Sequence, residues 1–479
     1  MTTLYDASSS DNLMAETHIK RKDLTVNSER SSRSDIRGRP AIFTILAVSL
    51  LVLVTACGGG GTSGGSAGTP SGKITVTLWS WTPISSTTQK MIAEIEKKYP
   101  NIQIKASIQP HTAYNTALKA AAASNSLPNL IGLPAGSDTQ EYRQYLLPLN
   151  PIAQEFWGAN WQSNFPKIAI EQARLGNPPG DENFYMLPQE TEVINLWYNK
   201  KIFNQLHLTP PKTLDQMVEA AQKIKAAGYI PFYQGGAQVN FVAWVYMQIA
   251  AQTDPTSLQA AAVQGKATWT SPGMIKAAQV WQTLFTKHVF QDNALSAQQY
   301  PTGANLFAAG KVGIISLGSW WLQQTKLENI PDGLRTMSDY GTFPFPAVTA
   351  GGQPTGPMGG IDFGWGLPKN ANSSPAVLDA SKKVLKELIS GVGEQVAVND
   401  LNDLPAFNGF KPQGQVDANV MALYNQFIED LQQAQNHYIG NPTVQQALVS
   451  NLQAVGAGTL PPEQAMAKVQ SVAQAQAGK

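Results

Sequence analysis

Two glutamates separated by one residue could either bind a sugar or help to cleave one. Glu190 and Glu192 lie in the segment "PQETEV" (188–193), and on an extended strand their side chains would share one face, roughly 6.5–7 Å apart. Carboxyl groups at about this separation can hydrolyse a glycosidic bond when one of them has a raised pKa. Carboxylates also accept hydrogen bonds from sugar hydroxyls without any reaction. Because the sequence gives no reason for a raised pKa at either residue, sugar binding is favoured and a secreted glycosidase is the distant alternative.

Tryptophans supply the complementary contact, because the flat C–H face of a sugar ring stacks on an aromatic ring. Trp320 and Trp321 are adjacent in "LGSWWLQQ" (317–324), and neighbouring side chains face apart on strands and helices alike. At most one of them can therefore be an ordinary core residue on an amphipathic helix, and the other needs a second role. Further aromatic or acidic candidates for a binding site are Trp79, Trp81, Tyr114, Asp138, Phe241, Trp244, Asp362 and Trp365.

The composition argues against other classes of site. The five histidines are scattered and Cys57 is the single cysteine, so neither a metal ion nor another cofactor is expected. Charged residues make up 14% of the chain and the net charge is +1, and without basic clusters a nucleic-acid partner is not expected. The chain is long enough for two or three domains or one large two-lobed unit.

Strand and helix patterns alternate along the chain after residue 72. β-branched, aromatic and apolar runs predict strands at 73–81, 101–108 and 127–135, and helical spacing predicts helices at 86–100 and 113–125 between them. This alternation is typical of a parallel α/β sheet with helices on both faces. Further strands are predicted at 193–198, 311–317 and 359–370, and further helices at 213–228, 241–252, 272–288, 302–309, 374–397, 417–436, 442–455 and 461–476.

The N-terminal residues resemble a secretion signal followed by a tether. Residues 41–56 form an apolar run after a basic flank, which is short for a membrane-spanning helix of about 20 residues but suits a signal peptide. The run ends in Val54-Thr55-Ala56-Cys57, which resembles a bacterial lipobox in which Cys57 becomes lipidated. The Gly/Ser-rich stretch at 58–72 suits a flexible tether. The alternative is a transmembrane anchor with an incidental cysteine.

Several segments, in order from residue 73 to residue 477, resemble the extracellular solute-binding proteins of ABC importers, in the sugar-binding group that includes maltose-binding protein. The most specific segment is "FYMLPQETEVINLWYNKKIF" (184–203), followed by Pro211-Lys212-Thr213. "LFAAGKVGIISLGSWWL" (306–322) resembles the family element that ends in a tryptophan, and "PPEQAMAKVQ" (461–470) resembles the family's closing helix. Each segment alone is weak, and their order over some 400 residues after a lipobox carries the resemblance.

The resemblance implies a two-lobed periplasmic-binding-protein-like α/β fold of type II, with a ligand cleft between lobes joined by a hinge of several crossings. It implies that Trp320 stacks on a sugar ring and that Glu192, six residues before Tyr198, binds the ligand. The expected partners are a saccharide and the permease of an ABC importer, for a monomer held by lipidated Cys57 on the outer face of the cell membrane. The expected divisions are 1–56 (signal peptide with a long polar n-region), 57–72 (lipidated cysteine and tether), 73–190 (lobe 1, first part), 191–340 (lobe 2, first part), 341–395 (return of lobe 1) and 396–479 (C-terminal helices, mainly lobe 2).

Two departures from the maltose-binding pattern affect the expected ligand. Leu133 and Gly136 stand where that pattern has an aromatic and an acidic residue, and Gln445 and Gln446 stand where it has a Trp-Tyr pair. A maltodextrin is therefore not supported, and another mono- or oligosaccharide is expected. The nearer alternative is a non-sugar solute such as a polyamine, since acidic candidates are available.

Overall fold

The computed structural model describes residues 72–262, 268–325 and 337–476. Residues 70–479 group into one compact unit. The apolar run at 41–56 and Cys57 lie outside the described residues, so the expected signal and tether have no structural account here. Within the described ranges, no helix combines the length and the apolar character that crossing a membrane requires.

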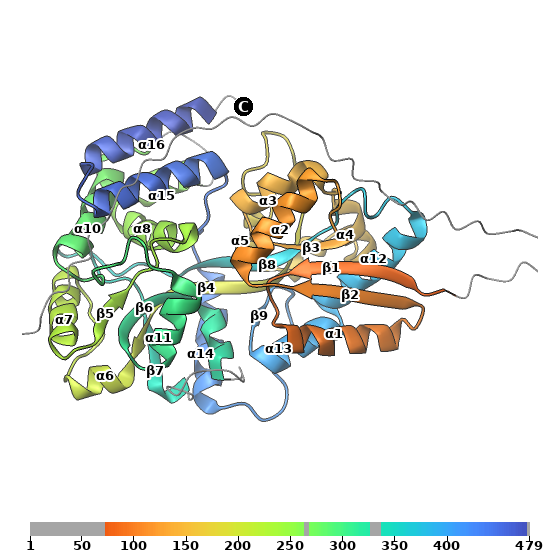
Figure 1. The fold of residues 1–479 in the computed structure, drawn as a ribbon, viewed down its shortest axis with the longest axis horizontal. Coiled ribbons are helices and arrows are strands. Elements are labelled where there is room, and N and C mark those ends of the chain that lie inside the picture. The colour runs from red at the N-terminus through yellow and green to blue at the C-terminus, as the bar shows by residue number, and fades with distance from the viewer. Residues whose placement is uncertain (1–71, 263–267, 326–336, 477–479) are drawn as a thin grey trace, which may run out of the picture. The chain divides into compact units, whose positions relative to one another are not determined.

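The centre of the fold is a nine-stranded mixed sheet (Figure 1). Seven strands follow the order β2-β1-β3-β8-β4-β6-β5, while β7 and β9 both pair with β4. The β1–β2, β1–β3 and β5–β6 pairs are parallel, and the pairs made by β4 and β8 are antiparallel. The strands are β1 (Ile74–Ser80), β2 (Ile102–Ile108), β3 (Leu130–Leu133), β4 (Leu187–Asn199), β5 (Ile230–Tyr233), β6 (Val312–Gly318), β7 (Tyr340–Phe343), β8 (Met358–Gly366) and β9 (Leu404–Pro405).

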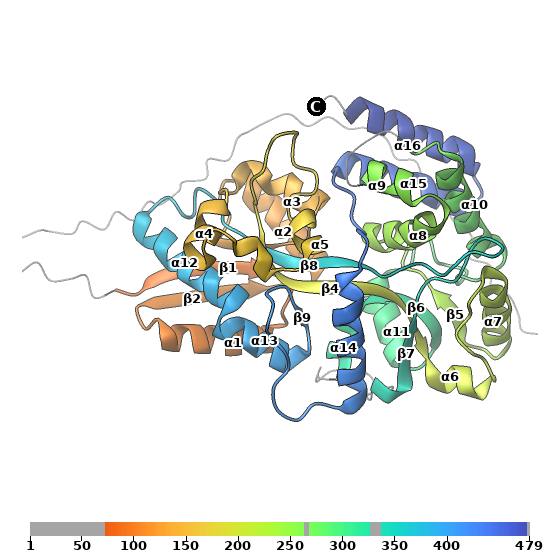
Figure 2. The ribbon, with the colours of Figure 1, turned by 180° about the vertical axis from the view of Figure 1, so that it is seen from behind.

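Strands β4 and β8 run between two groups of elements in both views of the ribbon (Figures 1 and 2). The first half of β4 pairs with β8 and β9, and its second half pairs with β6 and β7. This pairing on both edges buries nearly the whole strand, including the polar residues Gln189, Glu190 and Glu192. The strand was predicted only from residue 193, because the polar residues before it carry no strand pattern.

Helices cover the sheet on both sides (Figure 2). Local sequence explains several of their starts: the Thr213 side chain caps α7, and the Asn441 side chain caps α15, which has proline in its first turn. The helices are α1 (Ser85–Lys98), α2 (His111–Ala123), α3 (Ser137–Tyr142), α4 (Asn150–Trp157), α5 (Lys167–Gln172), α6 (Lys200–Gln205), α7 (Leu214–Ala226), α8 (Val239–Thr253), α9 (Pro255–Ala262), α10 (Pro272–Thr286), α11 (Ala304–Ala308), α12 (Pro375–Ser390), α13 (Val392–Leu401), α14 (Ala418–Gln432), α15 (Pro442–Gly456) and α16 (Pro462–Gln476).

The helix predicted at 374–397 is two helices, and that prediction is wrong in this respect. The chain breaks at Gly391, a residue with low helix propensity, and α13 begins directly after it. The Glu387 carboxylate accepts a hydrogen bond from the Val392 N–H at 3.2 Å, which satisfies one of the free donors at the start of α13. Glu387 also forms a salt bridge with Lys98 of α1 at 2.7 Å.

Candidate functional site

Trp320 is held in a defined position at the end of β6. It lies in a 3-10 helix over Ser319–Thr325, and its ring packs so closely on Gly318 that a Cβ atom at that position would collide with it. Its Nε1–H donates a hydrogen bond to the Tyr300 hydroxyl at 2.5 Å. Trp320 nevertheless keeps partial solvent exposure as a residue, so it is fixed in position without being fully buried.

Trp321 faces the opposite way, as the alternation of neighbouring side chains predicts. It is 0% exposed, with ring centroids 5.2 Å from Phe307 and 5.7 Å from Tyr340. Its Nε1–H has no hydrogen-bond partner. Trp321 is thus placed as a core residue, and no ligand reaches it in this conformation.

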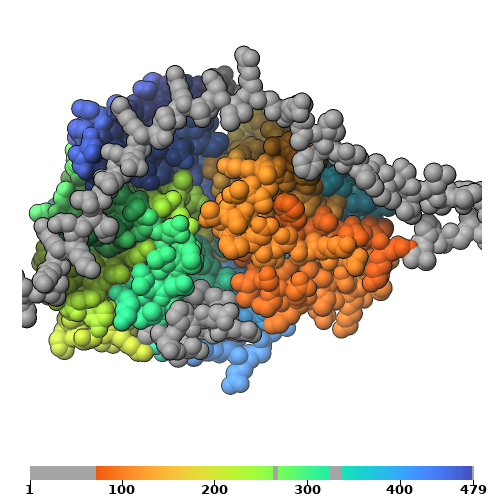
Figure 3. Space-filling model, in the orientation of Figure 1, coloured from red at the N-terminus to blue at the C-terminus, as the bar shows by residue number. Residues whose placement is uncertain are grey.

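An aromatic cluster surrounds Trp320, and Trp244 lies at its centre. The Trp244 ring centroid is 6.0 Å from Trp320, 5.0 Å from Phe241 and 5.5 Å from His437. The cluster comprises Phe241, Trp244, Tyr300, Trp320, His437 and Tyr438. On the face shown in Figure 3, a furrow separates the orange atoms of the segment that holds α2 from the green atoms of the segment that holds α11. Tyr300 lies just before α11, and Trp320 lies shortly after it in the chain.

Glu192 is tied to the aromatic cluster by hydrogen bonds. His437 Nε2 lies 2.6 Å and the Tyr438 hydroxyl 3.0 Å from Glu192 Oε1, and His437 Nδ1 lies 2.9 Å from the Gly359 carbonyl oxygen. Burial raises the pKa of Glu192 well above its usual range. Burial also lowers the pKa of His437 to about 3, although the hydrogen bond to the Gly359 carbonyl raises that pKa in part. A neutral His437 therefore donates Nδ1–H to the Gly359 carbonyl and accepts, at Nε2, a hydrogen bond from the protonated Glu192 carboxyl. The pair carries no net charge.

Four further carboxyl groups form what we call the acid cluster: Glu190, Asp362, Glu394 and Asp403. They come from β4, β8, α13 and the residue before β9, and the pairing of β8 and β9 with β4 around Glu190 and Thr191 brings them together. Glu190, Glu394 and Asp403 are buried, whereas Asp362 keeps partial exposure. Neither oxygen of Glu190 or of Glu394 has a hydrogen bond of ordinary geometry.

Burial is the largest cause that raises the pKa of each group in the acid cluster. Mutual repulsion adds to it: Asp403, Asp362 and Glu394 act on Glu190, and Asp362 acts on Asp403, whose pKa is raised to about 8. The Gln323 amide donates to Asp403 and lowers that pKa in part. Among the described residues, no group of three or more histidine, cysteine or acidic side chains is arranged to hold a metal ion.

Glu190 and Glu192 have different hydrogen-bond surroundings, although the Asp362 carboxyl interacts with both of them. The register between β4 and β8 is irregular between Glu190 and Thr191, and this irregularity breaks the two-residue alternation of a regular strand. Glu192 contacts His437 and Tyr438, whereas Glu190 belongs to the acid cluster. Both pKa values are raised, which leaves no ionised partner for the acid–base pair that glycoside hydrolysis requires.

The remaining predicted residues are divided between a half-buried set and a buried set. Trp79 and Trp81 are half-buried, and the Trp81 ring lies 5.5 Å from Tyr114 and 5.7 Å from Phe363. Tyr114 is buried and donates its hydroxyl to the Gly132 carbonyl at 2.6 Å.

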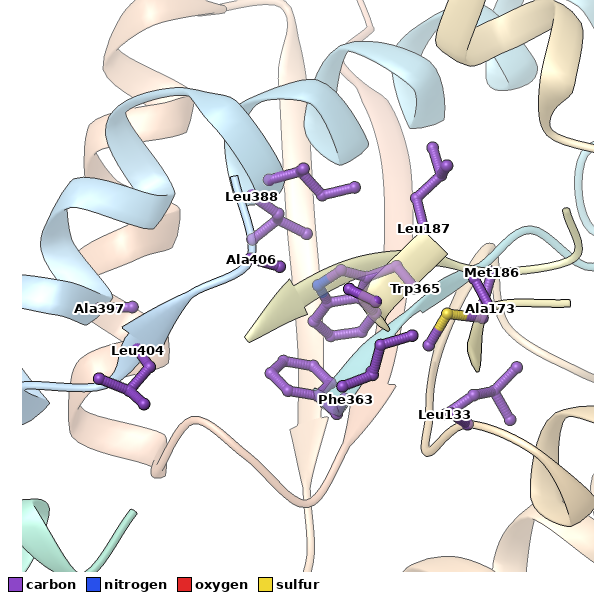
Figure 4. Packing of buried hydrophobic residues seen from close by; sticks show 14 of the residues in the cluster. Leu133, Ala173, Met186, Leu187, Phe363, Trp365, Leu388, Ala397, Leu404 and Ala406 are labelled. Atoms are coloured by element: carbon purple, nitrogen blue, oxygen red, sulfur yellow. The ribbon is translucent and has the colours of Figure 1, made fainter. Parts of the chain in front are cut away.

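Trp365 stands apart from the aromatic cluster, whereas Asp138 is close enough to Tyr438 for its charge to raise the pKa of that hydroxyl. Trp365 packs on Phe363 among apolar side chains (Figure 4) and donates its Nε1–H to Gln189. Asp138 lines a small cavity of about 50 Å³ beside Tyr114, and burial raises the pKa of its carboxyl to about 6. Trp365 is thus placed as a core residue, and Asp138 as a polar residue that lines a small cavity beside the aromatic cluster.

Three residues of the aromatic cluster were not predicted from the sequence: Tyr300, His437 and Tyr438. The adjacent pair in "QNHYIGN" (435–441) offered a signal, because a His-Tyr pair in a polar loop has no role in a helix core. The Trp-Tyr pair of the maltose-binding pattern falls instead on Gln445 and Gln446, eight residues further on. Gln445 itself is buried and bonds Ser137 and Asn240.

A larger cavity of about 310 Å³ lies between α5, α9 and residues 434–436. Its lining includes Glu171, Gln172, Gln259, Gln435 and Asn436 and contains no aromatic side chain. It therefore lacks a stacking surface for a sugar ring. The aromatic cluster is the better candidate site despite the greater volume of this cavity.

Comparison with known proteins connects the chain to a family. The family model of bacterial extracellular solute-binding proteins matches residues 79–390. The multiple sugar-binding protein of Streptococcus mutans is 25% identical over 279 residues, which cover 56% of this chain and 61% of that protein. The melibiose/raffinose/stachyose-binding protein of Bacillus subtilis is 26% identical over 220 residues, which cover 44% of this chain and 48% of that protein. The chain thus spans about half the length of the curated relatives it matches.

Solved structures show the same fold. A chitin oligosaccharide binding protein superposes with a TM-score of 0.70 at 22% identity, over 85% of this chain and 100% of that one. The predicted α/β fold of the sugar-binding solute-binding proteins is confirmed over most of the chain.

Proposed function

Because the chain belongs to the family of bacterial extracellular solute-binding proteins, we propose that it captures a mono- or oligosaccharide and passes it to the permease of an ABC importer. The observation that carries this proposal is Trp320, which is fixed in position without being fully buried. Its hydrogen bond to Tyr300 and its contact with Gly318 hold the ring in place, and a preorganised aromatic face loses little entropy when a sugar stacks on it. Two relatives whose names state sugar binding support the same ligand class.

The residues that keep solvent exposure are the candidates for direct contact: Trp320, Asp362, Trp79 and Trp81. Trp244, Phe241 and Glu192 support the site from behind, since they are buried within or beside the aromatic cluster. In the family's mode of action, the two lobes close around the solute, and closure is favoured because the ligand contacts both of them. Strands β4 and β8, which run between the two groups of elements, are the segments that would bend.

A thermal-shift screen of saccharides tests this proposal. A cognate saccharide at 100 times its Kd should stabilise the protein by about 2.7 kcal/mol, and unrelated sugars at the same concentration should not. The control is the Trp320→Ala variant, which should unfold normally but lose the response. If amino acids, peptides or phosphorylated solutes shift the melting temperature and no saccharide does, the carbohydrate proposal fails.

We also propose that Cys57 is lipidated and anchors the protein to the outer face of the cell membrane. The sequence Val54-Thr55-Ala56-Cys57 after an apolar run supports this. The Cys57→Ser variant, expressed in a bacterial host that lipidates secreted proteins, should move from the membrane fraction to the soluble secreted fraction. Continued membrane association of this variant would instead indicate that residues 41–56 form a transmembrane anchor.

A further inference from the structure

Among the residues that the structure describes, no Lys, Arg or His side chain forms an ion pair with the acid cluster. Buried carboxyl groups are normally paired with a cation or hydrogen-bonded. Four of them in one place therefore need an explanation beyond stability.

A polar group beside the acid cluster is also left without a partner. Tyr424 is 3% exposed as a residue, and its hydroxyl has no hydrogen bond, although it is close enough to Glu394 and Asp403 for their charges to raise its pKa. The Gln189 side chain, by contrast, is close enough to Glu394 to lower the pKa of that carboxyl in part. A cluster that existed only to stabilise the fold would be expected to bond the Tyr424 hydroxyl as well.

Asp362 connects the acid cluster to the aromatic cluster. It is the member of the acid cluster that keeps solvent exposure, and its charge acts on the hydroxyls of Tyr300 and Tyr438. Tyr300 is the residue that holds Trp320. Strand pairing sets Glu192 opposite Gly360 and Glu190 opposite Phe363, so Asp362 lies on β8 between these two positions. A ligand stacked on Trp320 would therefore lie near Asp362, with the buried carboxyl groups of Glu190 on the neighbouring strand β4 and of Asp403 just before β9.

We propose that the ligand carries a protonated amine, which Asp362 receives at the edge of the aromatic cluster, with the carboxyl groups of Glu190, Glu394 and Asp403 buried behind it. This inference rests on the proposed function, because it adds a cationic group to the saccharide. A neutral sugar needs only one or two carboxylates as hydrogen-bond acceptors, and it would leave the charge of an ionised Asp362 uncompensated. An ammonium group balances the charge of one carboxylate, that of Asp362, and gains a cation–π contact with Trp320 or Tyr300.

Binding of the amine should release protons. Without a ligand, burial and repulsion raise the pKa values of the acid cluster, so some of its members stay protonated at neutral pH. The ammonium group arrives with its charge, and the proton that Asp362 loses goes to the solvent. A neutral saccharide has no charge to replace that proton.

Titration calorimetry and thermal shifts on the full chain, purified in detergent, test the inference with matched probes. One pair of probes is glucosamine oligomers and N-acetylglucosamine oligomers of equal length, and the other pair is galactosamine and N-acetylgalactosamine. Spermidine serves as an amine that is not a sugar. We expect an amine-bearing saccharide to bind at least tenfold more tightly than its acetylated partner at pH 7. Titrations in buffers of different ionisation enthalpy should show proton release for the amine only.

Asp362→Asn should reduce the preference for the amine to less than threefold, and Asp362→Glu should retain it. The control is Asp379→Asn, which removes an exposed acid of α12 that pairs with Lys383 and should change nothing. Equal or tighter binding of acetylated sugars would overturn the inference while leaving the proposed function intact. Binding of spermidine without any saccharide would keep the amine site and overturn the proposed function, and the absence of any response to amines would overturn the inference.

Discussion

Replacing Trp321 with alanine should destabilise the protein by about 3–5 kcal/mol, the usual cost of deleting a large buried aromatic side chain. Trp321 is fully buried between Phe307 and Tyr340, so its removal leaves a cavity that the surrounding side chains cannot fill. Denaturant unfolding at equilibrium measures the loss. Ligand affinity should remain within about threefold of the parent for the protein that stays folded.

Trp320→Ala is the matched control, because the two residues are neighbours with opposite surroundings. This change should weaken ligand binding by more than tenfold, which corresponds to at least about 1.4 kcal/mol. The melting temperature should change by only a few degrees, since Trp320 is partly exposed. A large loss of stability with unchanged affinity would instead show that Trp320 is a core residue. Equal effects of the two changes would contradict the division between them.

The two tryptophans show what local sequence can predict. Alternation of neighbouring side chains required that they face apart, and the family resemblance favoured Trp320 as the ligand-side residue. The strands at 73–81, 101–108 and 311–317 were likewise predicted, because each has a continuous pattern of apolar and β-branched residues. Such features depend on positions within a few residues of one another.

Features that depend on long-range pairing were not predicted. The first half of β4 reads as polar, and only its two-sided pairing with β8 and β9 makes it a buried strand. The acid cluster joins residues from four separate elements, and Glu394 and Asp403 follow Glu190 by some two hundred residues. No spacing rule connects them, since the contact is made by the sheet order rather than by periodicity. His437 and Tyr438 reach Glu192 for the same reason.

The free energy of unfolding should fall as the pH rises from 7 to 8.5. Burial raises the native pKa of each group in the acid cluster, so each group keeps its proton in the native state at a pH where the unfolded chain has lost it. For Asp403 the native pKa is about 8 and the unfolded value is 3.8. Unfolding then releases protons, so higher pH favours the unfolded state, by up to about 1.4 kcal/mol per pH unit for each such group. Denaturant midpoints at pH 7, 7.75 and 8.5 measure the slope.

His437 acts in the opposite direction, but only at lower pH. Its native pKa is lowered to about 3 from an unfolded value of 6.5, so the native state holds fewer protons than the unfolded chain between those values. Stability from this residue is therefore lost as the pH falls below 6.5, and it is constant above pH 7. The range from 7 to 8.5 separates the acid cluster from this contribution.

Asp403→Asn should flatten the slope above pH 7, because asparagine is neutral in both states and fills nearly the same volume. Asp379→Asn should leave the slope unchanged, since that side chain is exposed and paired with Lys383. Gln323→Leu should move the decline to higher pH, because the Gln323 amide is the hydrogen-bond donor that lowers the pKa of Asp403. A stability that is constant or rises over this range would mean that the acid cluster is ionised in the native protein. A negative potential would then already be present before any ligand arrives.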